Sequence, residues 1–292
     1  MKETDIIRRF MFENIPVRGE IVHLDATWRA VLEKNEYPEI VKKTLGEFMS
    51  AAALLSSTLK FEGTLSFQVS GNGPISLMIM EATNHRTLRG IAKHSDNVPE
   101  SGNLHALFGD GNLVITIENT ISKERYQGII ELEGESVAEA LEKYLTQSEQ
   151  LDTRLWLATD NQQATGMLLQ RMPGQAETDA DAWTRVTHLG STITPEELVS
   201  LSAEEIIHRL FNEDDVRLLD AEPVSFRCSC SKERVRNMLR GLGHAEIRSI
   251  IEEEGVVDTS CEMCGQRYVF DQIDAEEIFA ADIHPDVPPT KH

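Results

Sequence analysis

The spacing of apolar and polar residues predicts mixed α and β structure over residues 1–175. Segment 38–60 carries a dense run of Ala, Leu and Met, which is typical of a helix buried on most of its faces. Leu65, Phe67 and Val69 alternate with polar neighbours, and this period of two predicts a strand over 64–70. Further strands are expected at 75–80, 112–118, 126–132, 153–158 and 166–170.

The order of these elements favours one fold class. Ser136 and Glu139 have the spacing of a capping box, which predicts a helix over 136–147. Strands follow one another, with helices grouped before and after them, so the pattern favours an α+β fold over a repeating βαβ fold. An N-terminal mixed α/β core domain is therefore expected over 1–175.

The next segment, 176–227, has the character of an acidic helical linker. Residues 176–182 (AETDADA) are acidic and almost without apolar side chains, which is a linker composition. Residues 176–222 hold 12 acidic and 3 basic residues, the densest negative charge in the chain.

Two short helices are predicted inside this linker. Thr194 with Glu197, and Ser202 with Glu205, repeat the capping-box spacing. Such short helices are marginal alone in water and depend on docking against something larger. Periodicity alone leaves two readings open: a subdomain permanently packed on its neighbours, or a metastable segment that detaches and exposes its apolar faces. The apolar positions on these helices are Leu198, Leu201, Ile206, Ile207, Leu210 and Phe211.

Charge and composition exclude several classes of protein. The 292 residues include 49 acidic and 28 basic ones, giving a formal net charge of −21, which repels nucleic-acid phosphates. No stretch approaches the roughly 20 apolar residues of a membrane span. The N-terminal sequence MKETDIIRRFMFE lacks the apolar core of a signal peptide, so a cytoplasmic location is expected. Nucleic acid and membrane are therefore not expected as partners.

Residues 1–227 lack the groups that an ordinary hydrolase or nucleotide enzyme needs. No cysteine precedes Cys228 and no Gly-x-Ser-x-Gly elbow occurs. His85, His94 and His105 do not have the spacing of metal ligands on one helix face. No catalytic residue is therefore predicted in residues 1–227.

All four cysteines fall near the C-terminus, as Cys228-Ser-Cys230 and Cys261-Glu-Met-Cys264. Two close pairs, separated by 30 residues, have the spacing of a tetrahedral Cys₄ zinc site. One Zn²⁺ is therefore expected in a small C-terminal domain, 228–292. The nearby basic residues, expected to ease thiolate formation, are Arg227, Lys232, Arg234, Arg236 and Arg267.

The cysteine spacing also allows other interpretations. A structural disulfide framework fits poorly with a cytosolic protein, and four Cys ligands leave no open position for a catalytic water. A zinc ribbon that binds nucleic acid conflicts with the negative charge.

Oxidants attack thiolates, and disulfides would remove the metal's ligands, so the site could act as a peroxide-sensitive latch. The spacing alone does not separate such a latch from an inert structural site. A zinc-dependent interaction module, or a thiol oxidoreductase using Cys261 and Cys264, also stays open.

Segments along the whole chain resemble the bacterial redox-regulated heat-shock protein 33 chaperone family. The least similar part is 175–222, although its acidic and helical character fits the family's linker. Met263 stands where the family has an aromatic residue, a departure that leaves the four cysteines untouched. The matching segments are FENIPVRGEIV, LLSSTLKFEGTLSFQVSGNGP, GNLVITI, ERYQGIIELEG, YLTQSEQLDTRLWLA, GMLLQRMPGQ, CSCSKERV and CEMCG.

The resemblance implies an ATP-independent holdase chaperone, not an enzyme, that is inactive when reduced and zinc-bound. It also makes the apolar linker positions the candidate client-binding residues: Leu198, Leu201, Ile206, Ile207, Leu210 and Phe211. Peroxide or hypochlorous acid, together with heat, would activate it by forming the disulfides Cys228–Cys230 and Cys261–Cys264 with release of zinc. The linker would then unfold and offer apolar surface to unfolding client proteins. The resemblance also implies a homodimer in the oxidised state.

Overall fold

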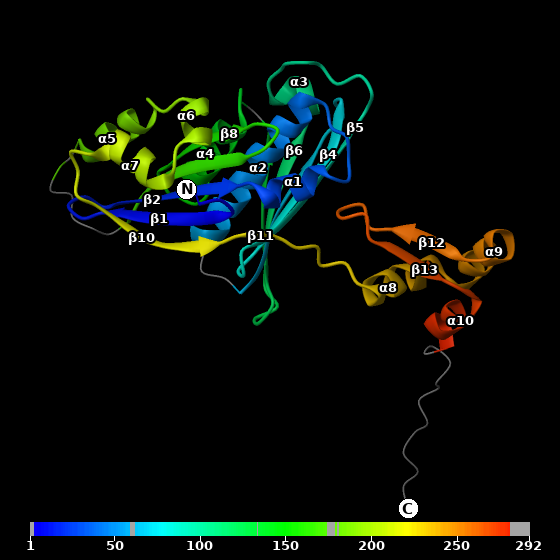
Figure 1. Ribbon diagram of the computed structural model, residues 1–292. Coiled ribbons are helices and arrows are strands. Elements are labelled where there is room, and N and C mark those ends of the chain that lie inside the picture. The colour runs from blue at the N-terminus through cyan, green and yellow to red at the C-terminus, as the bar shows by residue number, and fades with distance from the viewer. Residues whose placement is uncertain (1–2, 59–61, 133, 174–178, 180, 281–292) are drawn as a thin grey trace, which may run out of the picture. The chain divides into compact units, whose positions relative to one another are not determined.

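The structure of the chain is a computed structural model that describes residues 3–58, 62–132, 134–173, 179 and 181–280. It divides into two compact units, Met1–Arg227 and Cys228–His292, called here the N-terminal and C-terminal units. Figure 1 shows the elements of both.

Two sheets form the framework of the N-terminal unit. Sheet A has the strand order β10-β1-β2-β9-β8, and sheet B has the order β11-β5-β4-β3-β6-β7. All pairings are antiparallel except the short parallel pairing of β11 with β5. The strands are β1 (Ile6–Phe12), β2 (Val17–Leu24), β3 (Gly63–Ser70), β4 (Ile75–Thr83), β5 (Thr87–His94), β6 (Asn112–Asn119), β7 (Arg125–Glu131), β8 (Thr153–Thr159), β9 (Ala164–Arg171), β10 (Val216–Pro223) and β11 (Ser225–Phe226).

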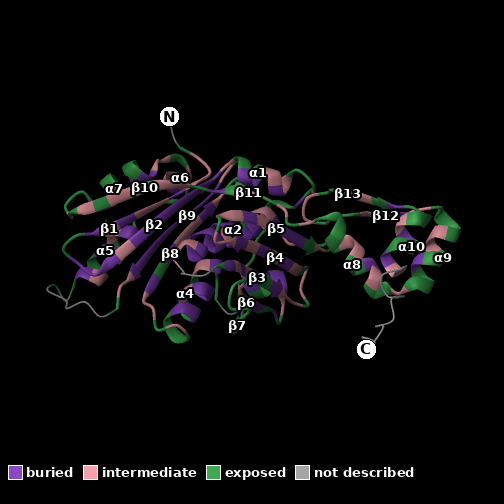
Figure 2. Cartoon of the chain, turned by 90° about the horizontal axis from the view of Figure 1, so that it is seen from below, coloured by how far each residue is buried: buried purple, intermediate pink, exposed green. Residues whose placement is uncertain are grey.

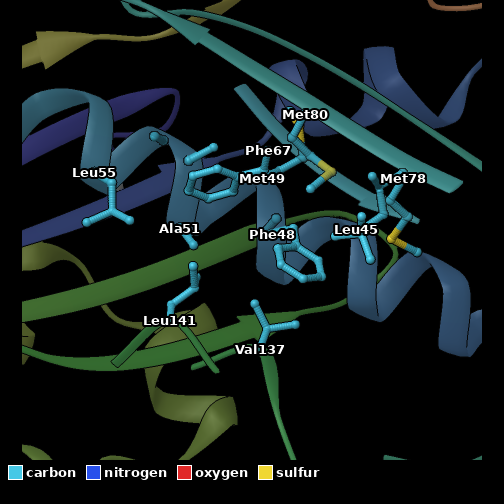
Figure 3. Close-up of a cluster of buried hydrophobic side chains, with 14 of the residues drawn as sticks. Leu45, Phe48, Met49, Ala51, Leu55, Phe67, Met78, Met80, Val137 and Leu141 are labelled. Atoms are coloured by element: carbon cyan, nitrogen blue, oxygen red, sulfur yellow. The ribbon is translucent and has the colours of Figure 1, made fainter. Parts of the chain in front are cut away.

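The central helix of this unit packs against strands of both sheets. Its 20 residues are nearly all buried toward the C-terminal half, as the run of Ala, Leu and Met predicts. Figure 3 shows Leu45, Phe48 and Met49 of this helix in the core, with Phe67 of β3 and Met80 of β4 close by. The helices are α1 (Ala26–Leu32), α2 (Glu39–Thr58), α3 (Leu104–Phe108), α4 (Val137–Gln147), α5 (Ala182–Gly190), α6 (Pro195–Ser200) and α7 (Ala203–Phe211).

Sheet A is buried on both faces, which explains why β9 does not alternate between apolar and polar residues. Leu168 belongs to the core around α2, whereas Met167 and Leu169 belong to a second core on the other face. The second core forms between sheet A and helices α5, α6 and α7. Gly19 of β2 is required there, because a Cβ atom at this position would lie 2.1 Å from the ring of Phe10.

The elements predicted from the sequence are confirmed where the structure describes them. The helix expected over 38–60 is α2, the one over 136–147 is α4, and the six expected strands are β3, β4, β6, β7, β8 and β9. Strands β1, β2 and β5 were not predicted. The mixed α+β character of the N-terminal unit is therefore as expected.

The linker is less uniformly helical than the sequence indicates. After α5, α6 and α7 the chain forms β10, which pairs with β1 at the edge of sheet A, and then β11 at the edge of sheet B. Segment 216–226 is strand because backbone pairing with existing edges satisfies its N–H and C=O groups. Most of the acidic stretch 176–182 lies outside the described residues.

The C-terminal unit is small. Its elements are α8 (Lys232–Leu242), α9 (His244–Glu254), β12 (Val257–Ser260), β13 (Arg267–Phe270) and α10 (Gln272–Ala280). Strands β12 and β13 form an antiparallel hairpin. Figure 2 shows this unit as mostly exposed or intermediate, with few buried residues. Its described core consists of Leu239, Ile247, Val257, Phe270, Ala275 and Ile278. A core of this size gives limited stability on its own.

Candidate metal centre and linker docking face

Four thiols from two separate loops meet in the C-terminal unit. Cys228 and Cys230 lie just before α8, whose N-cap Ser231 accepts a hydrogen bond from the backbone N–H of Arg234. Cys261 and Cys264 lie in the turn between β12 and β13. The hairpin and the start of the helix thus each present one pair of sulfurs.

The sulfur atoms form a cluster of the size that a metal ion needs. All four lie within 4.8 Å of one another. The Sγ atoms of Cys228 and Cys261 are 3.7 Å apart, and those of Cys230 and Cys264 are 3.4 Å apart. Four sulfurs placed tetrahedrally around Zn²⁺ at about 2.3 Å would be separated by about 3.8 Å. The four cysteines could therefore hold a metal ion together.

A tight turn fixes the second cysteine pair. The carbonyl oxygen of Cys261 accepts the N–H of Gly265 at 2.7 Å, and the N–H of Cys261 donates to the carbonyl oxygen of Gln266 at 2.9 Å. Gly265 has φ of +68°, in the left-handed region that favours glycine. The backbone N–H groups of Met263 and Cys264 hydrogen-bond the Cys261 thiol. The turn therefore aims backbone donors at sulfur.

The charge around the thiols differs from the sequence-based expectation. Burial raises the pKa of the Cys264 thiol to about 12 and also raises the pKa of Cys261. Two of the basic side chains that were expected to ease thiolate formation are paired with carboxylates. Arg267 pairs with Asp258, and Lys232 lies 2.9 Å from Asp274. For these two the expectation was wrong, because carboxylates close in space bind them.

Arg236 is also paired with carboxylates, since its guanidinium lies 3.3 Å from both Asp274 and Glu277. Arg234 donates to the hydroxyl of Ser229 at 2.5 Å. Since the surroundings do not stabilise free thiolates, a bound cation is what would keep the sulfurs deprotonated.

A side chain other than the four cysteines also touches the cluster. The hydroxyl of Tyr268, on β13, donates to Sγ of Cys230 at 3.1 Å. This contact raises the pKa of Tyr268 to about 12. Sequence reasoning missed Tyr268, because only the hairpin pairing brings it beside a cysteine 38 residues away.

The linker residues singled out from the sequence converge on sheet A. Leu198, Ile206, Leu210 and Phe211 are at most 4% exposed, and Leu201 and Ile207 pack at the margin of the same core. Figure 2 shows the buried strands of sheet A beside α5, α6 and α7. The residues of sheet A beneath these helices, called here the docking face, are Phe10, Phe12, Val17, Ile21, Ala158, Met167 and Leu169.

Aromatic contacts mark the centre of the docking face. The ring of Phe211 lies edge-on to Phe12 with centroids 5.1 Å apart, and its centroid is 6.1 Å from that of Phe10. Sequence reasoning did not identify Phe10 and Phe12. Their spacing of two residues is a strand signal, but it does not tell which face a linker covers.

Polar contacts order the linker helices. Both predicted capping boxes are present, at Thr194 with Glu197 and at Ser202 with Glu205. Arg8 of β1 makes an ion pair with Glu204 at the start of α7. The linker therefore docks through apolar burial with a few charged contacts at its margin.

Comparisons with known proteins agree with this arrangement. The model of a family described as "Hsp33 protein" matches residues 5–271. A 33 kDa chaperonin of Nitrosococcus oceani is 46% identical over the whole of both chains. Another, from Methylobacillus flagellatus, is 45% identical over 97% of each chain. A solved structure of the 33 kDa chaperonin of Thermotoga maritima covers 96% of this chain and 99% of its own at a TM-score of 0.79 and 20% identity, which shows a shared fold.

The family model and the relatives together place this α+β chain, with its four clustered cysteines, among the chaperones, which are a non-enzymatic class. The chain belongs to the Hsp33 family of 33 kDa chaperonins. Among the residues that the structure describes, no helix has the length and apolar character needed to cross a membrane.

Proposed function

We propose that this chaperone is an ATP-independent holdase of the bacterial cytosol, switched on by oxidation. At rest, Zn²⁺ would be bound by Cys228, Cys230, Cys261 and Cys264. The observation that carries this proposal is the cluster of four sulfurs within 4.8 Å, built from two loops of a unit with a small core. When bound, zinc would hold all four sulfurs as thiolates and tie the two loops together.

Activation forms two disulfides, Cys228–Cys230 and Cys261–Cys264. In each pair, peroxide oxidises one thiolate to a sulfenic acid, and the neighbouring thiol then displaces water from it. Each disulfide consumes one peroxide and two thiol protons and yields two waters. Neither sulfur in a disulfide remains a good ligand, so the site loses its metal.

The pairing determines whether the unit stays closed. In the resting geometry, sulfur–sulfur separations of 3.4 Å (Cys230 to Cys264) and 3.7 Å (Cys228 to Cys261) join the two loops. Disulfides across the loops would preserve the link that zinc supplies. Disulfides within each loop remove that link, because each pair is already close in sequence and closes only a very short loop. Only disulfides within each loop would therefore separate the two loops of the C-terminal unit.

Loss of the metal would unfold a small domain. Structural zinc contributes on the order of 10 kcal/mol to such folds, which exceeds what a core of this size supplies. The linker would then be loosened at its end next to Cys228. Release of its helices by heat would expose Leu198, Ile206, Leu210 and Phe211, together with the docking face. These apolar surfaces are proposed to bind unfolding client proteins, and the oxidised chain is proposed to form a homodimer.

The test is light scattering of a thermally unfolding client in the presence of the full chain. One sample is reduced and zinc-loaded, the other treated with peroxide at raised temperature, and a chromogenic chelator follows zinc in both. We expect aggregation to be suppressed only after oxidation, with zinc released in step. Equal behaviour of the two forms would contradict the switch and favour a zinc-dependent interaction module.

Two controls sharpen this test. Peptide mapping of the oxidised chain should find Cys228 joined to Cys230, and Cys261 joined to Cys264. Mapping that finds disulfides across the two loops would contradict the release mechanism. The chain should also fail to reduce insulin, since turnover there would indicate a thiol oxidoreductase.

A further inference from the structure

A cavity of about 650 Å³ lies in the N-terminal unit, within the size range of small-molecule sites. It is bounded by α2, α4 and strands of both sheets. Its apolar residues Leu55, Leu65, Phe67 and Leu145 belong to the core around α2, not to the core under the linker helices. The cavity is therefore separate from the docking face.

One end of the cavity carries a fixed cation. Arg18 of β2 lies opposite Gln170 of β9 and donates from Nε to its Oε1 at 3.1 Å. Gln170 is 3% exposed and donates in turn to the hydroxyl of Thr153 at 2.9 Å. This chain of hydrogen bonds across three strands holds the guanidinium at the cavity wall.

The pairing of Arg18 is unusual for such an acidic protein. Other arginines of the same unit have carboxylates close by, 2.6 Å away for Arg89 and 2.7 Å for Arg154. Within the described parts of the chain, Arg18 has no carboxylate within 4.0 Å, and its guanidinium bonds only to the neutral amide of Gln170. Glu20 lies two residues further along the same strand but outside ion-pair distance.

Glu20 attracts Arg18 electrostatically but makes no ion pair with it. A half-buried guanidinium that pairs with no carboxylate in the described residues suits an anionic group, since its planar fork binds carboxylates through two hydrogen bonds. The other charged residue of the cavity, Glu149, has its partners already. Glu149 accepts hydrogen bonds from the hydroxyls of Tyr126 at 2.9 Å and of Tyr144 at 2.7 Å. Its negative charge would repel an anion, so the anionic group is directed toward Arg18.

We propose that this cavity binds an amphipathic carboxylate of the fatty-acid class, with its carboxylate on Arg18 and its alkyl chain along the apolar wall. The apolar wall supplies most of the binding free energy, and Arg18 selects for the charged head group. This site does not depend on the redox state of the cysteines.

The test is isothermal titration calorimetry of the full chain, reduced and zinc-loaded, with decanoate below its micelle concentration. Decan-1-ol and decyltrimethylammonium serve as neutral and cationic probes of the same chain length. We expect one decanoate per chain, with decan-1-ol weaker by about tenfold, the factor that corresponds to one charge-assisted interaction. Arg18→Gln should weaken decanoate by a similar factor and leave decan-1-ol unchanged.

Two further variants make the result decisive. Arg29→Gln removes an exposed guanidinium that is paired with Asp25, and it should bind decanoate like the parent chain. Ile117→Trp, on the β6 wall, should fill the cavity and weaken both decanoate and decan-1-ol. No decanoate binding, equal affinity for the three probes, or undiminished binding by Arg18→Gln would each overturn the proposal.

Discussion

Removing the Phe211 ring should open the resting chaperone without touching the cysteines. Phe211 is 1% exposed and packs against Phe10 and Phe12 across the boundary between α7 and sheet A. Truncation of a buried Phe to Ala costs about 3–5 kcal/mol. Because these ring contacts join the linker to the sheet, the lost free energy mainly destabilises the docked state of the linker. It corresponds to an increase of about 10²- to 4 × 10³-fold in the equilibrium constant for linker release.

The assay combines hydrogen exchange with chaperone activity, both under reducing conditions with zinc saturated. Peptides covering 195–211 should exchange faster in Phe211→Ala, while those of α2 keep their protection. The reduced variant should also suppress aggregation of a thermally unfolding client. Ile121→Ala is the matched control, since Ile121 is apolar, lies in the same unit and is 76% exposed.

Two results would refute this reasoning. Unchanged exchange over 195–211 would show that the aromatic contacts do not hold the linker. Faster exchange without chaperone activity in the reduced state would show that linker release is not sufficient to expose a client-binding surface.

Three shorter predictions concern other groups. Burial raises the pKa of Glu20 from 4.5 to about 7, so the folded state keeps a proton that the unfolded state loses, and stability falls as pH rises through this window. Glu20→Gln should therefore stabilise the N-terminal unit by up to about 3 kcal/mol near pH 8 but not near pH 4, in urea denaturation; a difference independent of pH would contradict this. Tyr268→Phe removes the hydrogen bond to Cys230 and should lower zinc affinity by about tenfold in chelator competition. Cys261→Ser should lower zinc content and leave the linker sensitive to protease under reducing conditions, whereas an unchanged digestion pattern would argue against coupling.

The parts of the fold that the sequence predicts are those with strong local signals. Helix α2 has a long apolar run, and the capping boxes at Thr194 and Ser202 have polar residues at fixed offsets. The four cysteines are identified by spacing alone, because each loop must supply adjacent ligands. In each case the physical cause lies within a few residues of the signal.

The parts that it does not predict depend on contacts distant in sequence. Segment 216–223 has no clear alternation and becomes a strand only because β1 offers a free edge some 200 residues earlier. The basic residues near the cysteines appear suited to thiolates in one dimension. In the folded chain, however, Arg267 pairs with Asp258 and Lys232 pairs with Asp274. Tyr268 becomes part of the site only through the hairpin.

The linker is attached in two physically different ways, and this difference bears on the proposed switch. Near the cysteines the chain is held by β11, where the N–H groups of Ser225 and Arg227 donate to the carbonyl oxygens of Arg86 and Leu88 at 3.1 and 3.0 Å. Such bonds contribute about 1 kcal/mol each, and only Val224 and Phe226 add apolar packing there, so this attachment should yield soon after the metal site opens. Helices α6 and α7 are held by burial of several large apolar side chains, a stronger attachment. Oxidation alone would therefore loosen the end next to Cys228, and release of the helices would need the additional destabilisation that heat provides.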